Sequence, residues 1–559
     1  MMGSKSARHT LEWIQGRVHW LALTFILGFV VLGAVTLPKY GLTWDEGLGN
    51  LFFGERYCHY FATLDPAYLD FQKTDLAIHQ RPFNLALSPF RHRPYEFPPL
   101  ADTVSAAAME LLAYRLPWLD PVDAFHLPKI LLCGLLLWVL FAFARRRFGP
   151  WTALGAVVLL ASYPRFWGDM HFNPKDVPET VFFSLTIIAL VAWWRQPSWK
   201  RALGAGLVWG CALATKANAA FVPVILLLAA VPWRLRPWPG SGAWTHARRY
   251  AGHYALMVAS ALAVHVATWP YLFANPWRLF SYYSYINTRA RGGTVGWNWD
   301  ALWQTFATMP EVMVALFLMG IVLAIRLRHS ANGALLRLLV VWAAVPILRT
   351  SLPGTINFDG IRHFQEFLPP ACLLAAIAAS FIIAWLGQRW PARRWLGVGV
   401  VGLIVCANLA WIVARYAPYE HLYFNSLVGG LAGANRKYAI PEATDYWASS
   451  YRDGIRWLNG AADHNAVVHV AVAPWLVQMT APIWLRPDIE VRLPEPVPPL
   501  VLPDRSVYVM FVTRTGWYTD IAKYCVQNLS PIHQVLVDGF PVLQIYRLAM
   551  RVRELGDPP

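Results

Sequence analysis

The chain alternates between long apolar runs and polar or arginine-rich breaks. A helix needs about 20 predominantly apolar residues to cross the hydrocarbon core of a membrane, so runs of roughly 17 to 25 residues predict spanning helices. The runs are 20–38, 126–144, 150–163, 178–194, 201–216, 218–233, 251–270, 310–325, 336–350, 366–386 and 395–414. The pattern predicts an all-α polytopic membrane protein with about 11 transmembrane helices.

Composition supports a membrane protein, and the distribution of charge argues against a nucleic-acid-binding protein. Charged residues make up 14% of the 559 residues, whereas soluble domains carry about 25%. The net charge of +16 does not indicate a nucleic-acid partner, because most of the Lys and Arg excess falls in alternate loops, as in cytoplasmic loops of membrane proteins. These loops contain the stretches at 145–147, 195–201, 233–249, 326–337 and 388–394, and Lys5, Arg8 and Arg17 lie on the same side.

This topology predicts three parts. Residues 1–19 form a cytoplasmic N-terminus, and residues 20–414 form the transmembrane domain with a large outer loop at 39–125. Residues 415–559 form an extracytoplasmic domain. Its alternating segments "VVHVAVA" and "SVYVMFV" are typical of strands, so we expect a small α/β fold there.

Two adjacent acids, Asp45 and Glu46, lie in "YGLTWDEGLGN", where the first apolar run ends. Acids are common in solvated loops, and Trp44 beside them is an ordinary interfacial anchor. The alternative interpretation is a catalytic surface next to the bilayer.

The second outward loop is the polar segment "GDMHFNPKDVP". It places Asp169, His171, Lys175 and Asp176 at the start of the next expected helix. Helix capping by Asp176 and snorkelling by Lys175 would explain those two residues without any function. Asp169 and His171 have no such local role.

Further charged residues lie at the ends of other expected helices. Lys216 stands between two short runs, and ionisable residues at membrane depth are usually functional. "TINFDGIRHFQEFLPP" supplies Arg362 and His363 on another outward loop. A pair between Arg362 and Glu366 at helical spacing is the structural alternative there.

Together these residues suit an anionic, lipid-linked substrate. A polyprenyl phosphate keeps its tail in the bilayer and its charged head at the interface, where Lys175, Lys216, Arg362 or His363 would hold the phosphate oxygens. A carboxylate facing the sugar would take a proton from an acceptor hydroxyl or amine. The sequence predicts one base and one phosphate clamp on the outer face.

Several segments resemble membrane glycosyltransferases of the GT-C fold, in particular the protein O-mannosyltransferase-like and aminoarabinose-transferase-like families. They are "LTWDEG", "YEFPPLADTVSAAAMELL", "GDMHFNPKDVP", "GLVWGCALATKANAAF", "TWPYLFANPW" and "RHFQEFLPP". The resemblance implies Asp45 as the catalytic base with Glu46 as its partner. It also implies a second-loop acid, either Asp169 or Asp176, and a phosphate site at Lys216 and Arg362. His171 and His363 have no role that the resemblance assigns.

The resulting hypothesis is a transferase in a bacterial inner membrane. It uses a polyprenyl-phosphate-linked sugar and a lipid, glycan or protein acceptor among the membrane lipids, with inversion in one displacement. No cofactor is assigned, and a divalent metal bridging Asp45, a second-loop acid and the phosphate is left open. A transporter or flippase of lipid-linked sugars and a non-catalytic scaffold are the rival hypotheses.

Overall fold

The computed structural model describes residues 3–230, 242–289, 291–293, 296–390, 394–493 and 504–548. Every apolar run expected to span the membrane coincides with helix. The helices are α1 (Gly3–Thr36), α4 (Pro121–Phe148), α5 (Pro150–Ala161), α7 (Asp176–Arg195), α8 (Trp199–Leu213), α9 (Val222–Ala230), α10 (Gly242–Ala267), α13 (Glu311–Arg326), α14 (Gly333–Ser351), α15 (Leu368–Arg389) and α16 (Arg394–Tyr416). The end of the run 218–233 and parts of the basic stretches at 233–249 and 388–394 lie outside the described residues.

The chain is a multi-pass membrane protein, although the expected number of spans is not confirmed. In the described residues, six helices are long and apolar enough to cross a membrane. A seventh span results if α12 (Asp300–Ala307) and α13, which meet at a bend of 119°, are counted together. The segments 150–161 and 217–230 are apolar but shorter.

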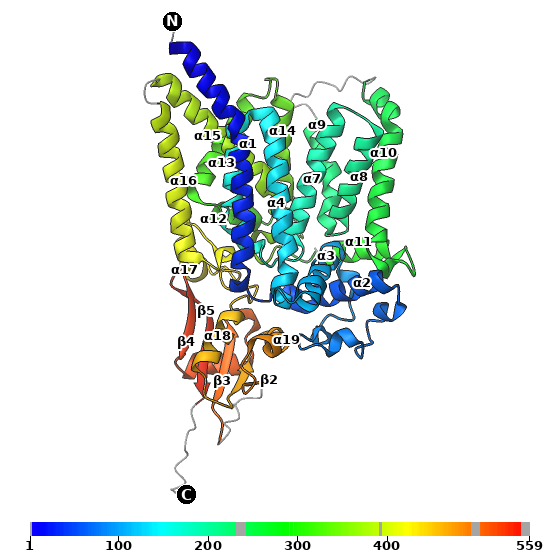
Figure 1. The fold of residues 1–559 in the computed structure, drawn as a ribbon, viewed down its shortest axis with the longest axis vertical. Helices are drawn as coiled ribbons and strands as arrows, with labels where there is room; N and C mark the ends of the chain where they lie inside the picture. The colour runs from blue at the N-terminus through cyan, green and yellow to red at the C-terminus, as the bar shows by residue number, and fades with distance from the viewer. Residues whose placement is uncertain are drawn as a thin grey trace, which may run out of the picture.

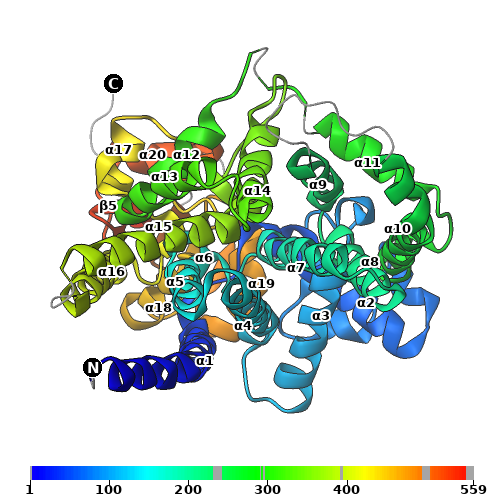
Figure 2. The same cartoon turned by 90° about the horizontal axis from the view of Figure 1, so that it is seen from above.

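Close helix packing explains the small residues of α8. A Cβ on Gly206 would lie 2.5 Å from the carbonyl oxygen of Met257, and one on Gly210 would lie 2.7 Å from that of Ala261. Both contacted residues belong to α10, so the glycines let the two backbones approach, as small residues do in membrane helix pairs. Figure 2 shows α8 between α7 and α10.

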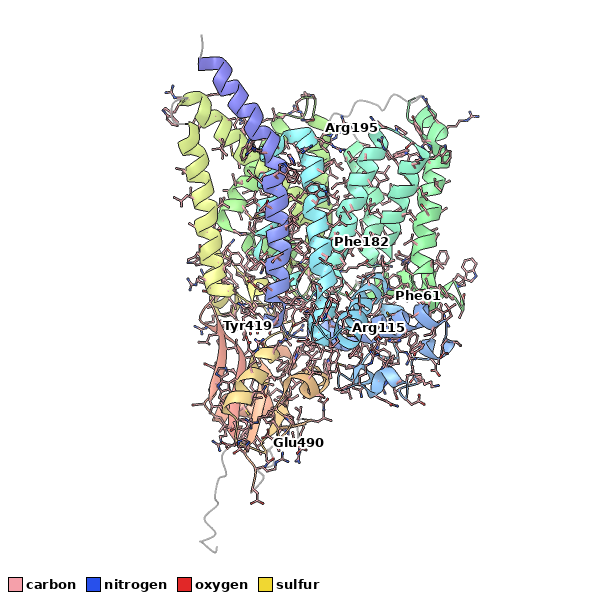
Figure 3. All side chains as sticks on the ribbon, in the orientation of Figure 1. Phe61, Arg115, Phe182, Arg195, Tyr419 and Glu490 are labelled. Carbon is pink, nitrogen blue, oxygen red and sulfur yellow. The ribbon has the colours of Figure 1, made fainter. Side chains whose placement is uncertain are left out.

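The loop 39–125 and the described residues after α16 lie at one end of the bundle (Figure 1). The loop contains α2 (Leu51–Thr63) and α3 (Leu100–Met109). Figure 3 places Arg195 at the opposite end from Arg115 and Glu490, the arrangement expected from the alternation of basic loops. The shorter helices are α6 (Pro164–Asp169), α11 (Arg278–Arg289) and α17 (Gly430–Arg436).

The C-terminal unit, residues 451–493 and 504–548, contains the small sheet that the sequence predicts. Its strands are β1 (Val467–Val470), β2 (Glu490–Arg492), β3 (Val507–Val512), β4 (His533–Val537) and β5 (Phe540–Leu548), in the order β2-β1-β3-β5-β4. Strand β1 is parallel to β2 and β3, and β5 is antiparallel to β3 and β4. Its helices are α18 (Tyr451–Ala461), α19 (Pro474–Trp484) and α20 (Asp520–Asn528). Strands β1 and β3 are buried throughout, which explains why nearly all of their residues are apolar.

Ion pairs fasten this unit to the bundle. Arg452 of α18 contacts Asp120 and Asp123 at the start of α4, each at 2.6 Å. Arg415 at the end of α16 contacts Asp538 of the β4–β5 turn at 2.6 Å.

Candidate active site

Asp45 lies in the turn that follows α1, on the face shared by the bundle and the C-terminal unit. The Thr43 hydroxyl and backbone N–H both donate to the Glu46 carboxylate, and these two bonds fix the turn. The Trp44 N–H donates to the carbonyl of Trp447 at 2.8 Å, which docks the turn on the segment before α18. The Asp45 side chain is 31% exposed and can therefore meet a substrate.

The guanidinium of Arg362 gathers acids from three parts of the chain. It contacts Asp45 at 2.6 Å, Asp359 at 2.7 Å and Asp176 at 3.7 Å. Arg362 is 7% exposed and lies in the short 3-10 helix Gly360–Phe367 that leads into α15. The planar fork of arginine suits such multiple contacts. The first-loop and second-loop acids therefore meet on one cation. Glu366, the expected local partner of Arg362, lies 3.6 Å from Arg349 instead.

Glu46 occupies a different environment from its neighbour. Its side chain is fully buried and lies 3.0 Å from both His126 and Lys129 of α4. Burial alone would raise the pKa of Glu46, but the charges and hydrogen bonds of His126 and Lys129 lower it to about 2. Glu46 is therefore held as a buried, fully paired carboxylate, and the geometry favours Asp45 alone as the reactive acid.

Asp176 begins α7 without acting as its cap. The Asn173 side-chain oxygen accepts the Asp176 N–H at 2.8 Å and so satisfies the first backbone N–H of the helix. The Asp176 carboxylate instead accepts from the Asn173 amide at 2.9 Å and pairs with Lys216. The Lys216 Nζ in turn lies 3.3 Å from Nδ1 of His363. Asp176, Lys216, Arg362 and His363, predicted from separate loops, thus form one cluster.

Lys175 contacts a backbone carbonyl and an aromatic ring. Its Nζ donates to the carbonyl of Glu96 at 3.3 Å and lies 4.3 Å over the ring of Phe97. In the part of the chain that the structure describes, no carboxylate lies within ion-pair distance of it. Burial lowers the pKa of Lys175 to about 8, although the carboxylates of Asp102, Asp45 and Glu96 act in the opposite direction.

Asp169 and His171 have structural partners away from Arg362. Gln365 donates to buried Asp169, and burial raises the pKa of Asp169 to about 7. His171 stacks on Tyr40 with ring centroids 3.8 Å apart and contacts the Thr36 hydroxyl at 2.9 Å. Of the two candidates for the second-loop acid, the geometry favours Asp176.

The site does not fit the bridging metal that the sequence left open. Within the described ranges, no group of three or more His, Cys, Asp or Glu side chains is arranged to hold a metal ion. The guanidinium of Arg362 occupies the position between the Asp45 and Asp176 carboxylates.

Two sets of residues escaped the sequence interpretation. In the sequence, His126 and Lys129 stand out only as ionisable residues at the start of an apolar run, and nothing there indicates their contact with Glu46. Arg514 of the C-terminal unit contacts Asp359 at 2.9 Å, and nothing in its local sequence indicates a role at a site formed by membrane loops.

Comparisons with known proteins identify similar sequences and folds. Residues 118–269 match the family model described as dolichyl-phosphate-mannose-protein mannosyltransferase. The crystal structure of ArnT from Cupriavidus metallidurans bound to undecaprenyl phosphate is similar to the chain, with a TM-score of 0.50 and 16% identity over 97% of this chain and 99% of that one. The apo ArnT structure gives the same TM-score and identity over 95% and 98%. No curated protein matches the chain. The resemblance expected from the sequence is confirmed, and the fold is that of ArnT.

Proposed function

We propose that this membrane protein, which has the GT-C fold and resembles polyprenyl-phosphate-dependent glycosyltransferases over its mannosyltransferase-like segment, is itself such an enzyme. It moves a sugar from a polyprenyl-phosphate donor to a hydroxyl or amine on the outer face of the membrane. The observation that carries this proposal is the partly exposed Asp45 carboxylate, held on Arg362 at the junction of three loops and the C-terminal unit.

The phosphate of the donor is assigned to the cations around Asp45. Lys216 and Arg362 are already paired with carboxylates, whereas Lys175 is not. An incoming phosphate therefore gains most from Lys175, with Lys216 and Arg362 as flanking charges. Neutralising the phosphate makes it a better leaving group, so no separate general acid is required.

Asp45 acts as general base in a single inverting displacement. The acceptor O–H or N–H gives its proton to the Asp45 carboxylate while the acceptor atom attacks the anomeric carbon. The bond from that carbon to the phosphate oxygen breaks, and the electron pair leaves with the polyprenyl phosphate. Arg362 holds the carboxylate in place and exchanges contacts between Asp45 and the phosphate as charge moves.

The enzyme is placed in a bacterial inner membrane with residues 1–19 cytoplasmic and residues 415–559 outside. Basic stretches such as 145–147 and 195–201 support this orientation. A donor that enters from the outer leaflet then reaches Asp45 without leaving the membrane. The acceptor, a lipid, glycan or protein, approaches along the C-terminal unit.

The test uses purified protein in nanodiscs, a panel of polyprenyl-phosphate sugars and a membrane lipid extract as acceptor. Mass spectrometry follows release of polyprenyl phosphate and sugar transfer in wild type, Asp45→Asn and Asp75→Asn. Asp75 is an exposed acid of the same loop outside the charge network, so its variant is the matched control. Turnover lost only in Asp45→Asn supports the proposal. Full activity of Asp45→Asn contradicts the base assignment, and absence of release with every donor favours a transporter or scaffold.

A further inference from the structure

Arg514 is a charged side chain of the C-terminal unit that reaches the candidate active site, where Trp475 and Trp517 of the same unit also pack on Trp44. It follows β3 and is 18% exposed. Its two terminal nitrogens donate to the carbonyl of Tyr446 and to Asp359, each at 2.9 Å. Its guanidinium also lies 4.7 Å over the ring of Trp44, the residue before Asp45.

Asp359 connects this arginine to Arg362. One carboxylate oxygen accepts from Arg514 and the other accepts from Arg362 at 2.7 Å. The residue is 7% exposed, and it is placed between two guanidinium groups that come from different parts of the chain. Two charge-assisted hydrogen bonds thus hold one carboxylate from opposite sides.

The backbone at this point is in a conformation that needs such support. Asp359 has φ +56° and Gly360 has φ +74°, both in the left-handed region. For a residue other than glycine this conformation is uncommon and persists only where the surroundings hold it. A Cβ on Gly360 would lie 2.4 Å from Nη1 of Arg165, so only glycine fits there without displacing that side chain. This turn leads directly into the helix that carries Arg362.

The contacts form a row of alternating charge, Arg514–Asp359–Arg362–Asp45, in which no contact exceeds 2.9 Å. We propose that Arg514 is a positioning residue for the transfer reaction. Through Asp359 it fixes the place of Arg362, and Arg362 orients the Asp45 carboxylate. The proposal rests on the function proposed above, in which Asp45 is the base, and makes the C-terminal unit part of the active centre.

Removal of Arg514 leaves the charge of Asp359 balanced by Arg362 alone. Arg362 is then drawn towards Asp359, and Asp45 loses part of the contact that orients it. Small displacements of a catalytic group reduce the chemical step more than substrate binding. We therefore expect Arg514→Gln to lower kcat about 10-fold while the donor KM changes less than about 3-fold.

Two further variants test whether the positive charge of Arg514, and not only the size of its side chain, is required. Arg514→Lys keeps a cation beside Asp359, and we expect it to recover kcat to within about 3-fold of wild type. Asparagine at position 359 tolerates the left-handed backbone. The change Asp359→Asn also removes the carboxylate charge that Arg514→Gln leaves with Arg362 alone. When Asp359→Asn is added to Arg514→Gln, we expect no further loss of kcat, because residues that act through one another have non-additive effects. Additive losses overturn the proposal.

Matched controls come from the other ion pairs between the C-terminal unit and the bundle. Arg452→Gln breaks the pair with Asp120 and Asp123, and Arg415→Gln breaks a more exposed pair with Asp538. Neither arginine belongs to the row. If Arg514 served only to dock the C-terminal unit, these variants would lower kcat in parallel with the melting midpoint, and that result overturns the proposal.

Hydrogen exchange tests the row Arg514–Asp359–Arg362–Asp45 without any sugar donor. In nanodiscs, we expect Arg514→Gln to increase deuterium uptake in residues 354–366 and 40–47, with no increase in Arg415→Gln. Unchanged uptake and unchanged kcat in Arg514→Gln overturn this proposal alone. Full turnover by Asp45→Asn overturns the proposed function instead, so the two failures are distinguishable.

Discussion

Two neighbouring carboxylates, Asp45 and Glu46, show how differently the two sides of one turn are built. Glu46 faces α4 and is enclosed by His126, Lys129 and Thr43. Asp45 faces the junction with the C-terminal unit, shares one arginine with other acids and stays partly exposed. A buried carboxylate with every charge matched supports the fold, whereas an exposed one on a shared cation can exchange partners with a substrate. The difference lies in the partners and not in the residue type.

We expect the largest effect on kcat from Asp45→Asn, which distinguishes Asp45 from Glu46. General bases contribute about 10²- to 10⁴-fold to rate, so we expect Asp45→Asn to lose about that factor in kcat. Its melting midpoint should stay near that of wild type, because the partly exposed pair contributes little to stability. Turnover assays and thermal melting on the same nanodisc preparation measure both. A large fall in melting midpoint with retained specific activity would assign Asp45 to the fold.

We expect Glu46→Gln to lower stability more than activity, the reverse of Asp45→Asn. Removing one partner of a buried ion pair leaves Lys129 and His126 uncompensated, which typically costs about 3–5 kcal/mol. We expect a low melting midpoint and poor yield, with the specific activity of the folded fraction within about 10-fold of wild type. Activity of the size-exclusion-purified folded fraction is the deciding measurement. A stable variant whose kcat falls as far as that of Asp45→Asn would instead make Glu46 part of the chemistry.

Lys175 gives a pH-dependent test of the donor site. Its lowered pKa of about 8 means that the amine is charged below that pH and becomes neutral as the pH rises through it. Because the charged form binds phosphate, affinity for undecaprenyl phosphate should fall about 10-fold between pH 7 and pH 9.

Lys175→Arg provides the matched comparison, since arginine stays charged throughout this range. Its affinity for undecaprenyl phosphate should be nearly independent of pH from 7 to 9. Calorimetric titration in nanodiscs measures both proteins. An equal pH dependence in wild type and Lys175→Arg would remove Lys175 from the phosphate site.

The sequence predicted much of the fold because its signals are local. Apolar runs located the helices, and alternating segments located the strands β1 and β3 of the C-terminal unit. The predicted number of spans is not confirmed, since segments such as α5 are too short for length and composition to decide. For the site, polar residues at helix ends identified Asp45, Asp176, Lys216 and Arg362, which the fold brings together. Arg514 was missed because its partner, Asp359, lies 155 positions away in the sequence, and such a contact leaves no local pattern.

The smallest expected effect decides between the two second-loop acids. Asp169 has a pKa raised to about 7 by burial, while an unfolded aspartate titrates near 3.9. Between these values the native state binds more protons than the unfolded state, so the stability contribution of Asp169 falls as pH rises from about 4 to about 7. Asparagine resembles the protonated acid and can still accept from Gln365. We therefore expect Asp169→Asn to change kcat less than about 3-fold and to raise the melting midpoint at pH 8 but not at pH 4.

Asp176→Asn serves as the comparison, because Asp176 pairs with Lys216 and Arg362. Its loss frees both cations and disturbs the cluster that holds Asp45, so we expect a kcat reduction of about 10- to 100-fold. Parallel melting curves at pH 4 and pH 8, with turnover measured at pH 7, test both variants. If Asp169→Asn lost the larger share of activity, the second-loop role would pass to Asp169. The network on Arg362 would then be a structural support for the turn and not the centre of the reaction.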